Sequence, residues 1–300
     1  MAVASAMATM TAVLTAAMAK IKGNWRVLQL SAWLGWQLES NWTDPLLFLG
    51  YIFVKPVASS LILLVMYLVV TRGDTTAPAF AGMYVGNAFF AFVGQVMFGV
   101  SWVIAEDREH FATLKYVYIS RIRLFWYLLG RAGAKFVITS ISTAVLLLFG
   151  RYALGVPLHL TGFRPLYFGV VFGLGIVGCV GASLFMAGIM LVAARNGGGY
   201  AEGLAGLFYL ASGALFPIDI LPRWLQGASL ALPFTYWIEG LKRALLGTAT
   251  GARLSALGDT GLLWRLALGT AAAIIVGAGA FRLAEHVARR RGLLDMQTQS

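Results

Sequence analysis

Long apolar runs, separated by short polar and charged segments, set the pattern of the chain. A helix needs about 20 mostly apolar residues to cross the ~30 Å hydrocarbon core of a bilayer. In the fourth run Gly169 and Gly173 form a GxxxG pair, a spacing that lets membrane helices approach closely. The pattern predicts an all-α membrane protein whose transmembrane domain covers residues 45–290. Its six transmembrane helices are expected at residues 45–70, 80–105, 125–149, 166–193, 200–215 and 261–283.

A more polar segment, residues 24–44, precedes the first apolar run. It combines an apolar face that contains Trp25, Trp33 and Trp36 with polar positions such as Arg26. Tryptophan side chains favour the headgroup layer of a membrane, and amphipathic helices lie along that layer. We therefore expect an N-terminal interfacial helix on the cytoplasmic surface. A peripheral helix packed on protein is the alternative.

Three prolines interrupt the segment between the fifth and sixth runs, residues 216–248. Pro217, Pro222 and Pro233 each break a helix, and the two pieces between them are too short to span a bilayer. Short helices at membrane depth are tolerated only where protein encloses them or where they line a cavity. We expect an outer-leaflet re-entrant helical hairpin here. An ordinary extracellular loop with two amphipathic helices is the alternative.

Composition and charge agree with a membrane location. The chain is 59% apolar and only 12% charged, about half of the 25% that is usual for soluble domains. The net charge of +11 would suggest nucleic acid as a partner for a soluble chain. Here Lys and Arg concentrate in segments that lie inside if both termini are cytoplasmic. We expect a multi-pass protein of the inner (cytoplasmic) membrane, in contact with lipid and not with nucleic acid.

The two ends of the chain are expected in the cytoplasm. Residues 1–23 lack the basic start of a signal peptide, because their first positive charge is Lys20, and they are expected to form a cytoplasmic extension. Residues 291–300 follow a basic cluster and form the expected cytoplasmic tail.

The sequence contains no recognisable motif for catalysis, metal binding or nucleotide binding. The only cysteine, Cys179, lies in an apolar run, and the three histidines have no metal-ligand spacing. The phosphate-binding pattern GxxxxGK[ST] does not occur. We therefore expect no catalytic residue, metal or cofactor in this chain.

Three polar residues inside the spans are the candidates for a transport pathway. Lys55 lies about ten residues, or ~15 Å, into the first span, and Asn87 and Gln95 lie in the second. A charge at membrane depth costs at least a few kcal/mol, which marks Lys55 as a functional candidate that can attract an anionic head group or substrate. The alternative is that its long stem carries the ammonium group to the cytoplasmic interface.

The proline-rich segment resembles a known family. The pattern resembles that of type 2 ABC transporter permeases and is closest to the branch of daunorubicin-resistance and nodulation-factor export permeases. The resemblance implies that ATP and Mg are bound by a separate ATP-binding cassette subunit. It also implies a second permease copy, as a homodimer or a pair of related permeases. The residues that carry it, expected at the outer gate and hairpin, are Phe216, Pro217, Leu221, Pro222, Pro233, Tyr236, Glu239 and Arg243. Of these, Glu239 and Arg243 are four apart and can pair on one helix face, in a structural role.

The same resemblance implies a coupling helix, which docks on the ATP-binding subunit, over residues 106–120. This segment has charges for a polar docking surface and an apolar stripe at helical spacing. The residues expected to make the docking contacts are Glu106, Asp107, Glu109, Phe111, Leu114 and Tyr118.

The expected function is that of the permease subunit of an ABC exporter, which is not an enzyme by itself. The tryptophan-rich helix and the outer hairpin suit an amphipathic or lipid-like substrate moved outward. The alternative is an ion-gradient-driven secondary transporter or channel. It would need an acidic or polar relay inside the spans, where Lys55, Asn87 and Gln95 are the obvious polar groups.

Overall fold

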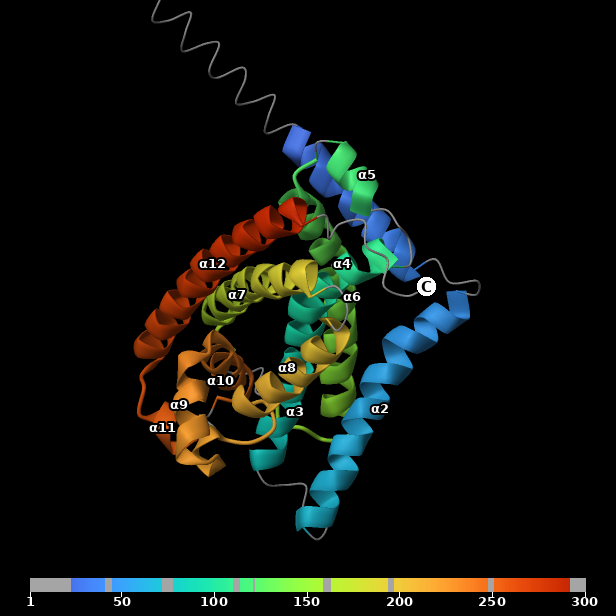
Figure 1. The fold of residues 1–300 in the computed structure, drawn as a ribbon. Helices are drawn as coiled ribbons and strands as arrows, with labels where there is room; N and C mark the ends of the chain where they lie inside the picture. Colours follow the sequence, from blue (N-terminus) through green and yellow to red (C-terminus); the bar gives the residue numbers. More distant parts are fainter. Residues whose placement is uncertain are drawn as a thin grey trace, which may run out of the picture.

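The computed structural model describes residues 23–40, 45–71, 78–109, 114–120, 122–158, 163–193, 197–247 and 251–291. Within these ranges every regular element is helical (Figure 1). The first helix covers residues 23–40 and is called the N-terminal helix below. The later elements are α2 (Pro45–Thr71), α3 (Pro78–Phe92), η1 (Val93–Phe98), α4 (Gly99–Glu109), α5 (Leu114–Ile119), α6 (Leu124–Tyr152), α7 (Pro165–Val192), α8 (Gly197–Ala211), η2 (Ile218–Ile220), α9 (Arg223–Ala231), α10 (Pro233–Leu246), α11 (Ala252–Ser255) and α12 (Asp259–Arg290).

Five helical stretches of the described chain are long and apolar enough to cross a membrane. They are Leu46–Val69, Ala79–Arg108, Leu124–Tyr152, Pro165–Val192 and Asp259–Arg290. The prediction of an all-helical chain with several membrane-crossing helices is therefore confirmed. The remaining predicted span, residues 200–215, corresponds to α8, which has 15 residues and ends at Ala211. At 1.5 Å per residue α8 is about 22 Å long, shorter than the hydrocarbon core.

The second crossing helix is a continuous rod made of α3, η1 and α4. Its middle part, Val93–Phe98, is π-helical, with one face buried in the bundle. Wider turns of this kind are rare, occur mostly as short insertions in α-helices and are frequent at functional sites. Gln95 lies in this segment and its side chain is exposed.

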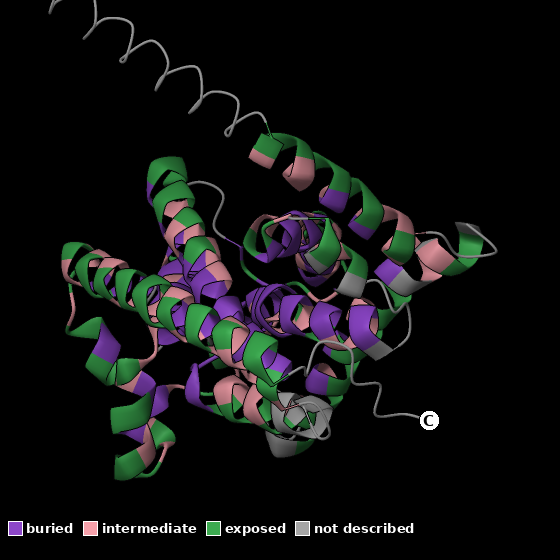
Figure 2. Ribbon diagram, turned by 45° about the horizontal axis from the view of Figure 1, so that its top comes forward, coloured by how far each residue is buried: buried purple, intermediate pink, exposed green. Residues whose placement is uncertain are grey.

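The helix α10 lies in the middle of the bundle although it is too short to cross a membrane. All of its residues except Pro233 and Arg243 are buried, and it packs against α3, α7 and α12. Its Trp237 is fully buried and contacts the rings of Phe92 and Phe172, with centroid distances of 6.3 and 6.5 Å. Figure 2 shows the buried residues gathered at the centre of the bundle. The burial of α10 meets the condition under which a short helix is tolerated at membrane depth.

The helices α7 and α12 approach each other closely. A Cβ atom on Gly277 would lie 2.0 Å from the carbonyl oxygen of Gly181, so the two backbones touch there. Small residues permit this approach between membrane helices. The predicted GxxxG pair does not make it: Gly169 and Gly173 have open space where a Cβ atom would be.

The N-terminal helix lies on α6 by a face of small residues. A Cβ atom on Gly130 of α6 would meet the Ser31 hydroxyl at 2.0 Å, and one on Gly35 would meet the Ala134 methyl at 3.0 Å. The opposite face exposes large apolar side chains, among them Trp25 and Trp33. The predicted segment 24–44 is thus helical over its first part, and residues 41–44 lie outside the described residues.

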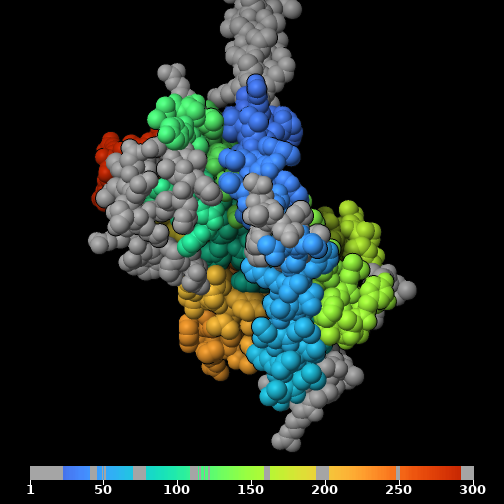
Figure 3. All heavy atoms as spheres, turned by 90° about the vertical axis from the view of Figure 1, so that its right-hand side faces the viewer, coloured from blue at the N-terminus to red at the C-terminus, as the bar shows by residue number. Residues whose placement is uncertain are grey.

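Figure 1 places the N-terminal helix, α5 and the C-terminal end of α12 at one end of the bundle, and α9 and α11 at the other. Figure 3, from the side, shows α2 along an outer face of the molecule, below the N-terminal helix. Most of the large apolar side chains of α2 are exposed, including Val54, Ile62, Val65 and Val69.

Candidate functional site

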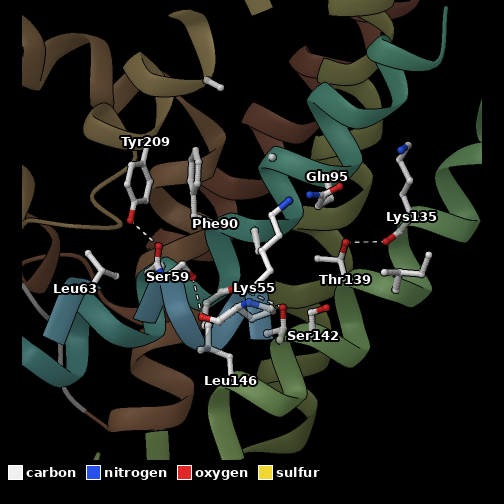
Figure 4. A pocket seen from close by; sticks show the side chains of 18 of the residues that line it. Lys55, Ser59, Leu63, Phe90, Gln95, Lys135, Thr139, Ser142, Leu146 and Tyr209 are labelled. Carbon is white, nitrogen blue, oxygen red and sulfur yellow. Dashed lines mark hydrogen bonds between the residues drawn. The ribbon is translucent and has the colours of Figure 1, made fainter. Parts of the chain in front are cut away.

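One cavity of about 600 Å³ brings the three candidate pathway residues together. It lies between the N-terminal helix, α2, α3, η1, α6 and α8. Lys55 of α2, Asn87 of α3 and Gln95 of η1 all line it. In Figure 4 the Lys55 side chain extends into the space between Tyr209 and Phe90 on one side and Thr139 and Ser142 on the other.

The cavity carries polar groups whose orientation is fixed by hydrogen bonds. The Tyr209 hydroxyl of α8 donates to the Asn87 side-chain oxygen at 2.6 Å, across the cavity wall from α8 to α3. On α6, the Thr139 hydroxyl donates to the Lys135 carbonyl at 2.7 Å. Because Tyr209 holds the Asn87 oxygen, the Asn87 amide nitrogen is the donor left for the cavity.

The rest of the cavity wall is apolar. Ile62 and Leu63 of α2, Phe90 of α3 and Leu146 of α6 supply its large side chains. A volume of about 300–1,000 Å³ with mostly apolar walls and a few placed polar groups is typical of small-molecule sites. The cavity can therefore hold a molecule that is apolar over most of its surface and polar at one point.

An ion pair stands at the side of the cavity near the N-terminal helix. The Lys135 ammonium of α6 donates to the Glu39 carboxylate, and both side chains line the cavity. The pair links the N-terminal helix to α6.

A second, deeper ion-pair network joins α4 to α6. The Arg131 guanidinium lies 3.5 Å from the Asp107 carboxylate and 3.7 Å from that of Glu106, and the Tyr127 hydroxyl donates to Asp107 at 2.6 Å. Arg131 and Asp107 are only 2% and 1% exposed. The adjacent Arg108 donates to the Met190 carbonyl of α7 at 3.3 Å. The end of α4 is thus held to both neighbouring helices.

The segment predicted as one coupling helix, residues 106–120, is described in two parts, because residues 110–113 lie outside the described residues. Glu106 and Asp107 belong to the last turn of α4, and a separate short helix, α5, begins at Leu114. Asp107 lies in the buried network, and Leu114 is 1% exposed and belongs to the core of this chain, so neither presents a docking surface. Among the described side chains of α5, Tyr116 and Ile119 are exposed, at 63% and 76%. Phe111 and the side chains of Glu109 and Tyr118 lie outside the described residues.

The prolines of the predicted hairpin stand where its short helices begin. Pro217 precedes η2, Pro222 precedes α9 and Pro233 opens α10. Phe216 is exposed, Leu221 is partly buried, and the buried Tyr236 donates from its hydroxyl to the Leu230 carbonyl at 2.7 Å. The three prolines therefore mark where the helices of this segment begin.

The predicted pairing of Glu239 with Arg243 is confirmed. The Arg243 Nε donates to the Glu239 carboxylate at 3.3 Å. Other guanidinium nitrogens donate to the Leu257 carbonyl at 2.8 Å, to the Leu254 carbonyl and to Asp259 at 3.4 Å. Arg243 thus ties α10 to α11 and to the start of α12, which is a structural role.

Sequence reasoning missed several residues that hold these sites. Lys242, which no sequence pattern singled out, is buried, and its ammonium donates to the Gly213 carbonyl at 2.7 Å. Tyr127, Arg131 and Lys135 were not linked to acidic partners. Their spacing of four residues was the available signal, because it places all three on one face of α6.

Comparison with known proteins gives the family. The family model for the ABC-2 type transporter matches residues 28–246, from the N-terminal helix to the end of α10. The chain belongs to the ABC-2 type transporter family. A search of curated proteins returned no match. An ABC-2 permease is a transmembrane subunit that does not itself hydrolyse ATP, and membership in this family implies an ABC ATP-binding partner. The coupling segment, α8 and α10 all lie inside the matched region.

Proposed function

We propose that this ABC-2 permease is the transmembrane subunit of an exporter that moves an amphipathic or lipid-like substrate outward. ATP and Mg are bound by a separate subunit. The observation that carries the proposal is the cavity, because it combines apolar walls with Lys55, Asn87 and Gln95 in a chain of this family. The ion-gradient alternative gains no support from the cavity: Glu39, the one carboxylate among its described lining residues, pairs with Lys135.

The proposed topology has six crossings in the inner membrane and both termini in the cytoplasm. The sixth crossing is α8, completed by the residues that follow Ala211. The N-terminal helix lies in the inner headgroup layer, where its exposed Trp25 and Trp33 meet lipid. The hairpin that contains α9 and α10 enters the outer leaflet, and the central position of α10 in the bundle supports this placement.

A second permease copy is proposed to cover the outer sides of α2 and α8. Both helices line the cavity and both expose apolar side chains elsewhere, such as Val65 and Val69 of α2 and Leu207 of α8. The complete transporter then contains two permeases and two ATP-binding subunits, and the two cavities face one another or merge.

We propose that the ATP-binding subunit docks on α5 and acts on the permease through this helix. Its exposed Tyr116 and Ile119 offer an apolar surface that suits a groove of the ATP-binding subunit, while Leu114 anchors the helix to its own chain. Movement of α5 reaches α4 and, through the Asp107–Arg131 pair, α6. Because α6 forms one wall of the cavity, ATP binding can change the shape of the cavity.

Substitution of an exposed and a buried residue of α5 tests this assignment. Ile119→Arg is expected to lower the ATPase activity of the reconstituted complex at least about tenfold, because it places a charge at the proposed centre of the interface, where a hot-spot residue contributes about 2 kcal/mol or more. The isolated permease should keep its thermal stability. Leu114→Arg should instead reduce the yield of folded permease, because it buries a charge.

Ser255→Arg, exposed at the opposite end of the bundle, is the matched control and should leave both readouts unchanged. Full ATPase activity and normal co-purification of the Ile119→Arg complex would remove α5 from the docking surface.

A further inference from the structure

Lys242 is a buried cation at the centre of the bundle. It lies in α10 and is only 2% exposed. A charged group withdrawn from water is costly unless its hydrogen bonds are made inside the protein. The Lys242 ammonium donates to the Gly213 carbonyl at 2.7 Å, and Gly213 lies 29 residues earlier in the chain. The ammonium thus ties α10 to the segment that follows α8.

The segment that receives this bond is the turn that ends α8, residues 212–214, called the α8 turn below. All three of its residues are buried. Gly213 has a φ of +73°, a conformation that glycine adopts without strain. The Ser212 hydroxyl accepts from the Ala214 amide at 3.3 Å, and the Ser212 amide donates to the Phe208 carbonyl at 2.8 Å. The turn therefore has a defined shape and continues directly from the last residues of α8.

The helix α3 contacts the α8 turn from another side. A Cβ atom on Gly86 of α3 would lie 2.3 Å from the Ala214 carbonyl oxygen and 2.8 Å from Cε of Lys242. The α3 backbone is therefore in contact with both the α8 turn and the Lys242 stem. The α8 turn is enclosed between α3 and α10, and the ammonium joins it to α10.

The helices α3 and α8 meet again at the cavity wall. Tyr209 lies four residues before Gly213, about one helical turn, and lines the cavity. Its hydroxyl donates to Asn87 of α3 at 2.6 Å, and its ring centroid lies 4.6 Å from that of Phe90. Figure 4 shows the Tyr209 and Phe90 side chains next to each other. A contact that fixes the α8 turn therefore also fixes how closely α8 approaches α3 at the cavity.

The charged end of Lys242, and not its stem, can hold the turn. Glu239, 3% exposed, precedes Lys242 by three residues on α10, a spacing that places two side chains on one face of a helix. Its negative charge favours the ammonium form of Lys242. An uncharged side chain of the same length would keep the packing against Gly86 but would lose the hydrogen bond to the buried Gly213 carbonyl.

We infer that Lys242 is a positioning residue of the permease: its ammonium holds the α8 turn on α10 and thereby fixes the cavity wall made by Tyr209, Asn87 and Phe90. The inference rests on the proposed function only in treating this cavity as the transport pathway. Movement of α10 then reaches the cavity through the bond between Lys242 and Gly213. In this role Lys242 contacts no substrate.

Hydrogen exchange of the α8 turn tests the contact. The full chain in phosphatidylcholine nanodiscs is compared with Lys242→Met, which has an unbranched apolar side chain of similar length. The variant is expected to raise the exchange rates of the amides in residues 208–214 at least about tenfold, because the buried Gly213 carbonyl loses its donor and the turn opens more often. Unchanged exchange rates in these residues would overturn the inference.

Arg243→Met removes a neighbouring cation from the same helix and is the matched control. Arg243 is 10% exposed and donates to α11, to the residues that follow it and to the start of α12. Its loss should speed exchange in residues 252–259 and leave residues 208–214 unchanged. Equal acceleration of residues 208–214 in Lys242→Met and Arg243→Met would show a general loosening of the bundle, and the specific role of Lys242 would be wrong.

A second variant reaches the same turn without removing a charge. Gly86→Ala places a methyl group 2.3 Å from the Ala214 carbonyl oxygen, so the turn must move away from α3. Faster exchange in residues 208–214 is expected here as well. Gly94→Ala, on the same helical rod, has open space at its Cβ position and should leave these amides unchanged. Wild-type exchange in Gly86→Ala would show that the α8 turn is not enclosed as inferred.

A spin label at Gly206 reports whether the cavity wall follows the turn. Gly206 of α8 lines the cavity and has open space at its Cβ position, so Gly206→Cys can carry a nitroxide in a Cys179→Ala background. In Lys242→Met the rotational correlation time of the label is expected to fall at least about twofold. In Arg243→Met the label should stay as restricted as in the wild type. Equal label mobility in Lys242→Met and the wild type would overturn the positioning role, even with faster exchange of the turn.

Failure of this inference can be told apart from failure of the proposed function. The exchange and label measurements use the permease without ATP, so they test Lys242 alone. Addition of ATP and the ATP-binding subunit to the Gly206-labelled protein tests the exporter proposal, because ATP binding should change the mobility of the label. An ATP response without an effect of Lys242→Met would make this inference alone wrong. The expected Lys242→Met effects without an ATP response would make the exporter proposal wrong.

Discussion

Arg131 shows how a single buried side chain holds the inner end of the bundle. Its guanidinium is enclosed between α4 and α6, and Asp107, Glu106 and Tyr127 surround it. Replacing a buried ion pair by apolar groups is often neutral, but removing one partner leaves an uncompensated charge. The network therefore fixes how α4 and α6 are placed relative to each other, even if its net contribution to stability is small.

Removal of one partner in this network should be strongly destabilising. Asp107→Ala is expected to lower the free energy of unfolding by about 3–5 kcal/mol, because Arg131 loses its closest buried carboxylate. Denaturant unfolding of the purified protein in detergent measures the change. Glu285→Ala breaks an exposed pair with Arg289 on α12 and is the control, with an expected loss of at most about 0.5 kcal/mol. Similar losses for the two variants would contradict the role given to burial.

Residue-level predictions from the sequence succeeded where a local rule decided the outcome. The pairing of Glu239 with Arg243 follows from spacing on one helix, and spacing is visible in the sequence. Asp107 and Leu114 were expected to face a partner protein, but both are buried in this chain. A polar or apolar face looks the same in the sequence whichever molecule covers it, so only the tertiary structure could decide.

At the scale of elements, the proline-rich segment shows how a helix too short to cross can occupy the core. Three prolines divide the segment at positions that sequence alone identified. A short helix is tolerated in the membrane only where protein encloses it or where it lines a cavity, and the sequence predicted enclosure only on that ground. In the structure α10 packs against α3, α7 and α12. One other feature left no clear trace in the sequence: the π-helical turns of η1.

The contact between α7 and α12 should depend on one glycine of α12. Gly277→Ala would place a methyl group 2.0 Å from the Gly181 carbonyl oxygen, so the two helices must move apart. Overpacking of this kind costs about 1–3 kcal/mol. Gly279, on the same helix, has open space, and Gly279→Ala should raise stability by up to about 1 kcal/mol through helix propensity. Thermal unfolding in one detergent compares the two, and equal or reversed shifts would show that this contact is not tight.

The number of membrane crossings decides whether the two ends of the chain lie on the same side of the membrane. Five described helices meet the length and hydropathy expected of a crossing, and five crossings would put the two ends of the chain on opposite sides of a membrane. Yet the N-terminal helix and the C-terminal end of α12 lie at the same end of the bundle (Figure 1). The six crossings proposed above would put both ends on one side. The candidate for the additional crossing is α8, which is short and continues into the turn at Gly213.

Labelling from one side of the membrane decides whether α8 crosses. Ser120, after α5, and Ser255, in α11, are both exposed, and α6, α7 and α8 lie between them. If α8 crosses, three crossings separate the two positions and they lie on opposite sides; if it does not, two crossings leave them on the same side. In a Cys179→Ala background, an impermeant maleimide added to right-side-out vesicles should label Ser255→Cys at once. Ser120→Cys should react only after the vesicles are opened. The native Cys179 is buried, so wild-type protein controls for background labelling. Labelling of both positions from the outside would exclude α8 as a crossing helix, and with it the six-span topology.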